Sequence, residues 1–255
     1  MPEKRKMSET LKNDVKHVLF VIAMEAEAKP FLDHLSLKLI EHDHKSLSLQ
    51  LFQGVYKENM KITVAVNGKC NRFNVDNVGT TPAALSTYLA INHVKPDLII
   101  NAGTAGGFKS KGADIGDVFL SSNFKHHDRR IPIPGFTEYG VGDHDSILTP
   151  KLAEYLKAKV GVITTSNSLD HNETDDQIML DHNASVKDME AAAVAWVAEQ
   201  TSTPCFGLKV VTDIVDGDKP TSEEFLENLS SAAKNLQETL PKVVDFIVGK
   251  TIHEL

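Results

Sequence analysis

The sequence has few of the features that mark secreted, membrane-spanning or disulfide-stabilised proteins. Its 255 residues include only two cysteines, Cys70 and Cys205, which are too few for a disulfide framework and lack metal-site spacing. The apolar run from Val18 to Met24 is far too short to span a bilayer. Residues 1–16 lack the apolar stretch of a signal peptide. We therefore expect a cytoplasmic protein with no membrane partner.

The sequence also lacks an excess of positive charge. Acidic residues outnumber basic ones by 35 to 27, which gives a net charge of −8, and no basic cluster is longer than Lys4-Arg5-Lys6. Nucleic acids are therefore not expected partners. The hydrophobic fraction of 41% is sufficient for a real core. We expect a loose tail over residues 1–16, with Met7 as an alternative start, and one domain over residues 17–255.

Apolar segments of strand length alternate with helical patterns along the chain. Residues 17–23, 96–101 and 206–213 are typical of buried strands, and residues 47–52 and 61–66 alternate like the two arms of a hairpin. No internal repeat or linker divides the sequence. These patterns predict a single α/β domain with a mixed central β-sheet flanked by helices.

Several motifs are too weak to define a function alone. Residues 102–107 (Ala-Gly-Thr-Ala-Gly-Gly) predict a glycine-rich turn that lets backbone approach a ligand, but they form neither a Walker loop nor a dinucleotide fingerprint. Lys69 and Arg72 lie in a polar loop where they could meet an anion. Adjacent His126 and His127 point to opposite faces of an extended chain, so no shared metal is predicted.

Three acidic residues, Glu27, Glu190 and Asp213, follow predicted strands. The carboxyl ends of strands in open α/β sheets meet where ligands bind, and burial there raises the pKa of a carboxyl group. Each residue also has a simpler interpretation. Glu27 and Glu190 are suited to the first turn of a helix, and Asp213 is suited to a turn. Together, however, the three acids predict one cleft with acid–base chemistry.

Five motifs in order carry a resemblance to a known family. They are Ala-Met-Glu-Ala-Glu at 23–27, Asn-Ala-Gly-Thr-Ala-Gly-Gly at 101–107, Asp-Arg-Arg-Ile-Pro-Ile-Pro at 128–134, Lys-Asp-Met-Glu at 187–190, and Thr-Asp at 212–213 with Val-Asp-Gly-Asp-Lys-Pro-Thr at 215–221. Over about residues 18–247 the chain resembles the 5′-methylthioadenosine/S-adenosylhomocysteine nucleosidases, particularly the plant type, of the purine nucleoside phosphorylase superfamily. The resemblance implies a nucleoside phosphorylase-like fold and hydrolysis of methylthioadenosine to adenine and 5-methylthioribose in methionine salvage.

The resemblance also implies roles for individual residues. Asp213 would protonate the five-membered ring of adenine, and Glu27 would take a proton from the attacking water. Glu190 would accept hydrogen bonds from both ribose hydroxyls, with Met189 packed beneath the sugar. No metal or organic cofactor is implied.

The remaining substrate-binding positions carried over from the family are Thr104, Leu169, Asp170, Lys187 and Asp188. In the family, the positions of Leu169 and Asp170 border the base. Leu169 replaces a phenylalanine that stacks on adenine in many bacterial members, Lys209 replaces an arginine, and residues 219–222 lack the aromatic that closes their 5′ pocket. We therefore expect a preference for methylthioadenosine over S-adenosylhomocysteine.

The sequence leaves two alternative functions open, and it also predicts an oligomeric state. A nucleoside phosphorylase would need a phosphate site of arginines and backbone amides, and a non-catalytic nucleoside-binding or storage protein should have lost one of the three acids. The apolar loop from Ile131 to Phe136 is expected to be covered by a partner, which predicts a homodimer.

Overall fold

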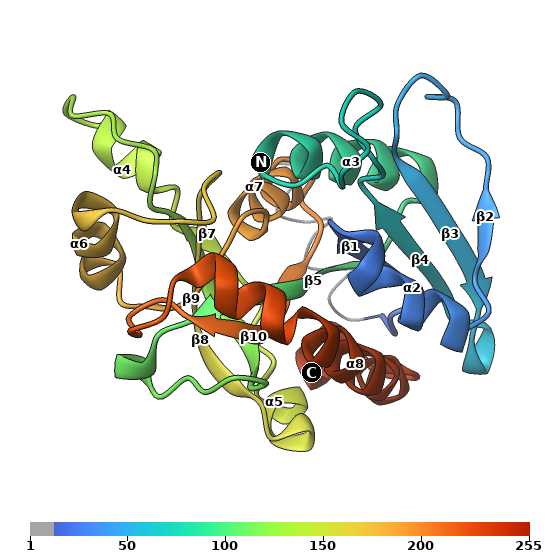
Figure 1. The fold of residues 1–255 in the computed structure, drawn as a ribbon. Coiled ribbons are helices and arrows are strands. Elements are labelled where there is room, and N and C mark those ends of the chain that lie inside the picture. Colours follow the sequence, from blue (N-terminus) through green and yellow to red (C-terminus); the bar gives the residue numbers. More distant parts are fainter. Residues whose placement is uncertain (1–12) are drawn as a thin grey trace.

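The computed structural model describes residues 13–255, which form one ten-stranded mixed sheet with helices on both faces (Figure 1). This confirms the predicted single α/β domain. The strands are β1 (His17–Ile22), β2 (Lys38–Ile40), β3 (Gln50–Val55), β4 (Lys61–Val66), β5 (Leu98–Gly107), β6 (Val118–His126), β7 (His144–Asp145), β8 (Lys159–Thr165), β9 (Ala184–Asp188) and β10 (Cys205–Ile214).

The helices come from segments between these strands, as the alternating pattern predicts. They are α2 (Glu25–His34), α3 (Thr80–Val94), α4 (Phe136–Val141), α5 (Pro150–Leu156), α6 (Glu173–Asp181), α7 (Ala191–Gln200) and α8 (Thr221–Ile247), with short 3₁₀ turns η1 (Lys57–Asn59), η2 (Lys109–Lys111) and η3 (Ile252–Glu254). Among residues 13–255, no helix has the length and apolar character needed to cross a membrane.

The centre of the sheet is parallel and buried on both faces. β1 pairs in parallel with β4 and β5, and β10 pairs in parallel with β5. Alternate β1 residues enter two different cores: Phe20 packs in the core that α2 and α8 cover, whereas Leu19 packs in the core that α3 and α7 cover. Burial on both faces explains why these strands are apolar without alternation.

The sheet closes on itself next to the parallel centre. β5 pairs with β9, β9 with β8, β8 with β6, β6 with β10, and β10 again with β5. This ring brings the carboxyl ends of β5, β9 and β10 together, although the three segments are far apart in the sequence. The ring therefore creates the place where the acidic residues can meet.

The predicted glycine-rich turn at residues 102–107 is wrong, because β5 continues as a strand through Gly107. Its glycines have strand partners on both sides: Gly103 pairs with Lys209 of β10, and Gly106 pairs with Lys187 of β9. Glycine runs usually break strands, but these two neighbours supply the hydrogen bonds that hold the segment extended. The glycines instead leave room for side chains from other elements.

The two ends of the domain also differ from expectation. Residues 1–12 of the predicted tail lie outside the described residues, but Val15 is buried and its amide donates to Lys250 O at 2.8 Å. The folded domain therefore includes Val15. Ser222, Glu223 and Glu224 are typical of a capped helix start, but no side chain caps α8 among the described residues; Glu224 instead accepts the Ile214 amide of β10 at 2.7 Å.

Candidate active site

A cavity lies at the carboxyl ends of β5, β9 and β10. All the predicted site residues except Asp170 line it, namely Glu27, Thr104, Leu169, Lys187, Asp188, Met189, Glu190 and Asp213. The side chain of Asp170 lies outside this lining and is exposed; only its backbone carbonyl reaches the site region, where Lys187 contacts it. The fold therefore assembles the residues that the sequence could only place at separate strand ends.

Glu27 is a buried carboxylate fixed by three donors. Its Oε1 accepts from the backbone N and the Oγ1 of Thr104, both at 2.7 Å, and its Oε2 accepts from Met24 N at 3.3 Å. Burial raises the pKa of Glu27, while Thr104 and the nearby Lys209 ammonium oppose that rise. Gly103 makes this approach possible, because a Cβ there would lie 3.2 Å from Oε1. The carboxylate is held as a proton acceptor.

Asp213 is equally buried but less constrained. Its Oδ1 accepts from Thr212 Oγ1 at 2.7 Å, whereas Oδ2 is buried without a hydrogen-bond partner among residues 13–255. Burial raises the pKa of Asp213 above its ordinary value, against the effects of Thr212 and Lys187. A Cβ at Gly106 would lie only 2.5 Å from Oδ2, so glycine is required there. Oδ2 is free to carry a proton toward a bound molecule.

Glu190 precedes α7 and turns its side chain toward α3. Glu190 lies just before the helix and not in its first turn, because it has non-helical backbone angles and α7 begins at Ala191. Glu190 Oε1 accepts from Gly79 N at 2.7 Å, at the positive end of α3. Burial and the Asp188 carboxylate raise the pKa of Glu190 to about 7.

Asp188 and Lys209 form a buried ion pair next to Glu190, with Nζ 2.8 Å from Oδ2. Asp188 also accepts from Thr165 Oγ1 at 2.5 Å and from Ala191 N at 2.8 Å, so it fixes the start of α7. Burial alone would lower the pKa of Lys209, but Asp188, Glu190 and Glu27 together raise it. Lys209 therefore stays charged and offsets part of the negative charge of this region.

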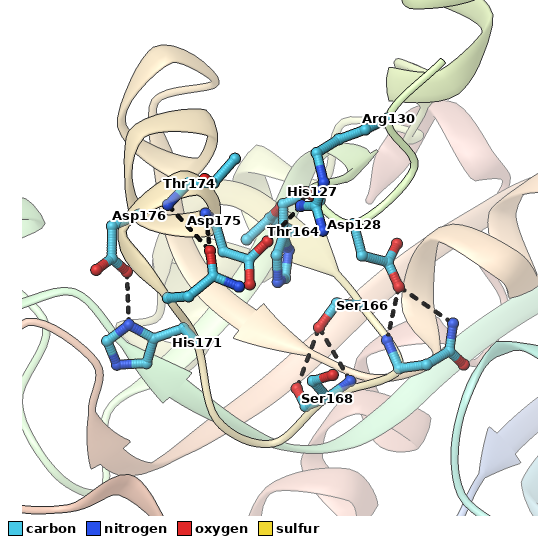
Figure 2. A network of polar contacts seen from close by, with 12 residues as sticks. His127, Asp128, Arg130, Thr164, Ser166, Ser168, His171, Thr174, Asp175 and Asp176 are labelled. Atoms are coloured by element: carbon cyan, nitrogen blue, oxygen red, sulfur yellow. Dashed lines mark hydrogen bonds and ion pairs between the residues drawn. The ribbon is translucent and has the colours of Figure 1, made fainter.

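The β8–α6 loop (residues 166–172) forms another wall of the cavity. Leu169 contributes its side chain, and the buried Lys187 ammonium donates to the carbonyls of Leu169 and Asp170 at 2.6 and 2.7 Å. Burial lowers the pKa of Lys187, although Asp213 opposes the effect. Figure 2 shows polar contacts from the segment after β6, in which Asp128 binds the start of this loop and Arg130 binds Asp175 in the following helix α6.

Several residues that line the cavity were not predicted from the sequence as site residues, and Lys209 was noted only as a difference from bacterial members of the family. Lys209, Val78, Thr221 and Phe225 all line the cavity. The stretch 219–222 lacks an aromatic, as noted from the sequence, yet Phe225 supplies one from the next turn of α8. Helical spacing from the cavity-lining Thr221 could have identified Phe225, since residues four apart share a helix face.

The predicted anion loop does not contribute to the cavity formed by the described residues. Lys69 lies 3.1 Å from Glu25 and 3.4 Å from Asp76, and Arg72 lies over the ring of Phe73 at 4.9 Å. Both cations are thus occupied outside the cavity lining. Within residues 13–255, no group of three or more potential ligands is arranged to hold a metal ion.

Comparison with known proteins agrees with this geometry. Residues 17–245 match the sequence profile of the phosphorylase superfamily, so the chain belongs to that superfamily. A 5′-methylthioadenosine/S-adenosylhomocysteine nucleosidase of Arabidopsis thaliana is 45% identical over 253 residues, covering 98% of each chain. Within the superfamily, the chain belongs to the methylthioadenosine nucleosidases.

Two further similarities cover nearly the whole chain. A 5′-methylthioadenosine nucleosidase of Arabidopsis thaliana is 46% identical over 256 residues, covering 100% of this chain and 95% of the relative. The solved structure of an Arabidopsis thaliana 5′-methylthioadenosine nucleosidase in apo form matches with a TM-score of 0.93 at 46% identity. That match covers 95% of this chain and 100% of the other.

Proposed function

We propose that the protein hydrolyses the N-glycosidic bond of 5′-methylthioadenosine and releases adenine and 5-methylthioribose. One observation carries the proposal: Glu27, Glu190 and Asp213 line a single cavity as buried carboxyl groups, and the pKa of each is raised. Groups of this kind gather where proton transfer is needed. The similarity to nucleosidases of Arabidopsis thaliana supports the same reaction.

The proposed reaction starts with Asp213. Its raised pKa, and an Oδ2 that has no partner within residues 13–255, support a protonated acid that gives its proton to the five-membered ring of adenine. The leaving base then departs neutral, and the bond electrons stay with it. The ribosyl group acquires the character of an oxocarbenium ion, which nearby carboxylates stabilise. Positioned acids of this kind contribute roughly 10²–10⁴-fold to the rate.

Glu27 and Glu190 complete the proposed mechanism. A water molecule attacks the sugar carbon and loses one proton to Glu27, whose hydrogen bonds hold it as an acceptor. Glu190 accepts hydrogen bonds from the ribose hydroxyls, with Met189 beneath the sugar. Asp213 is then reprotonated and Glu27 deprotonated by solvent, so the cycle closes with one water consumed.

Phosphorolysis is the alternative that the site favours less. A phosphate ion in the cavity would need free cations, and the cations that line it within residues 13–255 are Lys187 and Lys209. Lys187 is bound to two carbonyls, and Lys209 is paired with Asp188. A storage protein is also disfavoured, because all three acids are present in the cavity.

Incubation with methylthioadenosine, with and without phosphate, tests this function. Hydrolysis predicts equal rates of adenine release in both buffers and free 5-methylthioribose as the sugar product. A phosphate requirement with a sugar phosphate product would identify a phosphorylase. Binding of the nucleoside without release of adenine would identify a binding protein.

The cavity favours a small apolar 5′ substituent. Phe225 and Val78 line it, and burying the charged amino acid tail of S-adenosylhomocysteine against such residues without partners is costly. We therefore propose a preference for methylthioadenosine, tested by comparing kcat/KM for the two nucleosides. Equal values would contradict it.

We also propose that the protein is a homodimer. More than half of each apolar side chain is exposed at Ile133, Phe136 and Tyr139, in and beside the 131–136 loop. Tyr88 on α3 and Trp196 on α7 are exposed as well, and Figure 1 places α4, α7 and α3 along one side of the molecule. Such a surface is typical of an interface. A fully active monomer in sedimentation at micromolar concentration would contradict this proposal.

A further inference from the structure

Asn167 is a polar residue of the β8–α6 loop whose side chain connects three separate segments. Its Oδ1 accepts from the backbone N and the Oγ1 of Thr80, both at 2.9 Å. Its backbone N and its Nδ2 donate to Asp128 Oδ2 at 2.9 and 3.3 Å. The Thr80 amide can only donate and an ionised carboxylate can only accept, so these partners fix the orientation of the amide group.

The Thr80 contact leads to the part of the site that holds Glu190. Thr80 is the first residue of α3, and the preceding Gly79 donates its amide to Glu190 Oε1. A Cβ on Gly79 would lie 2.9 Å from Asn167 Oδ1, so the two residues are in close contact. Asn167 thus fixes the position of the backbone that orients Glu190.

The Asp128 contact leads to the wall that carries Leu169. Asp128 follows β6, and in Figure 2 its carboxylate accepts two hydrogen bonds at the start of the β8–α6 loop. Arg130, two residues later, lies 2.5 Å from Asp175 in α6. The segment after β6 therefore holds the loop on both sides of Leu169, while Lys187 binds the carbonyls in its middle.

We propose that Asn167, anchored by Asp128, is a positioning residue that fixes the Leu169 wall relative to Glu190. The inference deepens the proposed nucleosidase function and rests on it. The side chain of Asn167 does not line the cavity and contacts no catalytic group directly. It acts through Gly79 on one side and through the loop backbone on the other. This positioning role also involves Asp128, the first residue of the motif at 128–134, which takes no part in the proposed chemistry.

Exchange of the two side chains tests the pairing. Asn167→Asp keeps an acceptor for Thr80 but places a second carboxylate against Asp128. We expect kcat/KM to fall about tenfold, since small displacements of substrate-positioning groups can cost up to ~100-fold. The inhibition constant of adenine, which reports on the Leu169 wall beside the proposed base site, should rise as well. Adding Asp128→Asn should restore part of both values, because it removes the repulsion between the two carboxylates while the amide oxygen at position 128 can still accept from the backbone N of residue 167.

Matched controls separate positioning from folding. Asn92→Asp changes an exposed asparagine on α3 whose Nδ2 donates to Tyr88 O and whose Oδ1 accepts from Lys95 Nζ, and it should behave like the wild-type protein. Asn167→Ser provides a second variant without the repulsion and should lose less activity than Asn167→Asp. Melting temperatures are measured for all variants. If Asn167 had only a structural role, its substitution would lower the melting temperature, and the double variant Asn167→Asp with Asp128→Asn would not recover kcat/KM.

Wild-type kinetics for Asn167→Asp, or a double variant no better than the single one, would overturn the inference. Failure of the proposed function is distinguishable, because the wild-type protein would then not release adenine from methylthioadenosine. In that case adenine affinity across the same variants, measured by calorimetry, still tests the effect of Asn167 on the Leu169 wall.

Discussion

Glu27 and Asp213 are both buried carboxyl groups of one cavity, but their surroundings differ. Three donors satisfy the two oxygens of Glu27, and the hydroxyl of Thr104 is one of them. Asp213 has one donor, Thr212, on Oδ1, and its Oδ2 has no partner within residues 13–255. Desolvation raises the pKa of both groups, so burial alone does not distinguish them.

The difference in hydrogen bonding assigns the two roles. Donors stabilise the ionised form of a carboxyl group, whereas an unpaired buried oxygen favours the form that carries a proton. Glu27 is therefore equipped to accept a proton from water, and Asp213 to donate one to a leaving group. Two glycines of β5 allow the arrangement: Gly103 faces Glu27 and Gly106 faces Asp213. The following predictions test the comparison.

The largest effect is expected from Asp213→Asn. Asparagine preserves the size of the side chain but cannot donate the required proton, so turnover should fall by roughly 10²–10⁴-fold while substrate affinity changes little. Steady-state kinetics and equilibrium binding measure the two quantities. Asp218→Asn, at an exposed position in the turn after β10, is the control. Turnover above about a tenth of wild type would remove Asp213 from the role of acid.

A smaller loss is expected from Gly106→Ala. The new Cβ would meet Asp213 Oδ2 at 2.5 Å and Val215 Cγ2 at 2.7 Å, and the carboxyl group must move. We expect a roughly tenfold to hundredfold fall in kcat, as for other small displacements of catalytic groups. Gly103→Ala is the matched variant on the Glu27 side, where the nearest contact is 3.2 Å. A greater loss in Gly103→Ala than in Gly106→Ala would contradict the geometry.

The smallest effect concerns the pH dependence that Glu190 contributes. Its pKa of about 7 means that the ionised form, which we propose accepts from the ribose hydroxyls, is lost as the pH falls below 7. The value of kcat/KM should decline over that range in the wild-type protein. In Glu190→Gln the overall level should be lower and this part of the pH profile absent. An unchanged profile in the variant would assign the titration to another group.

The same pKa determines how Glu190 affects stability. Between pH 4.5 and about pH 7, Glu190 is protonated in the folded protein but ionised in the unfolded chain. The free energy that this bound proton contributes to folding is therefore complete below pH 4.5 and is lost as the pH rises through about 7. Relative to wild type, Glu190→Gln should therefore be more stable at pH 8 than at pH 5. Urea unfolding at the two pH values measures the difference.

The sequence predicts the acidic centre well because strand ends are local features. Glu27 and Glu190 follow predicted strands and Asp213 ends one. The parallel pairing of β1 and β10 with β5 brings Glu27 and Asp213 to one edge, whereas β9 brings Glu190 there through an antiparallel pairing with the end of β5. The extension of β5 through Gly107 was not predictable, because it depends on partners in β9 and β10. The Gly79–Glu190 hydrogen bond joins residues 111 positions apart, and no local pattern indicates it.

The central claim is that Asp213 serves the leaving group whereas Glu27 serves the water. A 5-methylthioriboside of 4-nitrophenol separates the two roles, since 4-nitrophenolate departs without protonation. Cleavage is followed by absorbance for the wild-type protein, Asp213→Asn and Glu27→Gln. We predict that Asp213→Asn loses cleavage of methylthioadenosine but retains cleavage of the nitrophenyl substrate, whereas Glu27→Gln loses both. Equal losses of Asp213→Asn on both substrates would contradict the account.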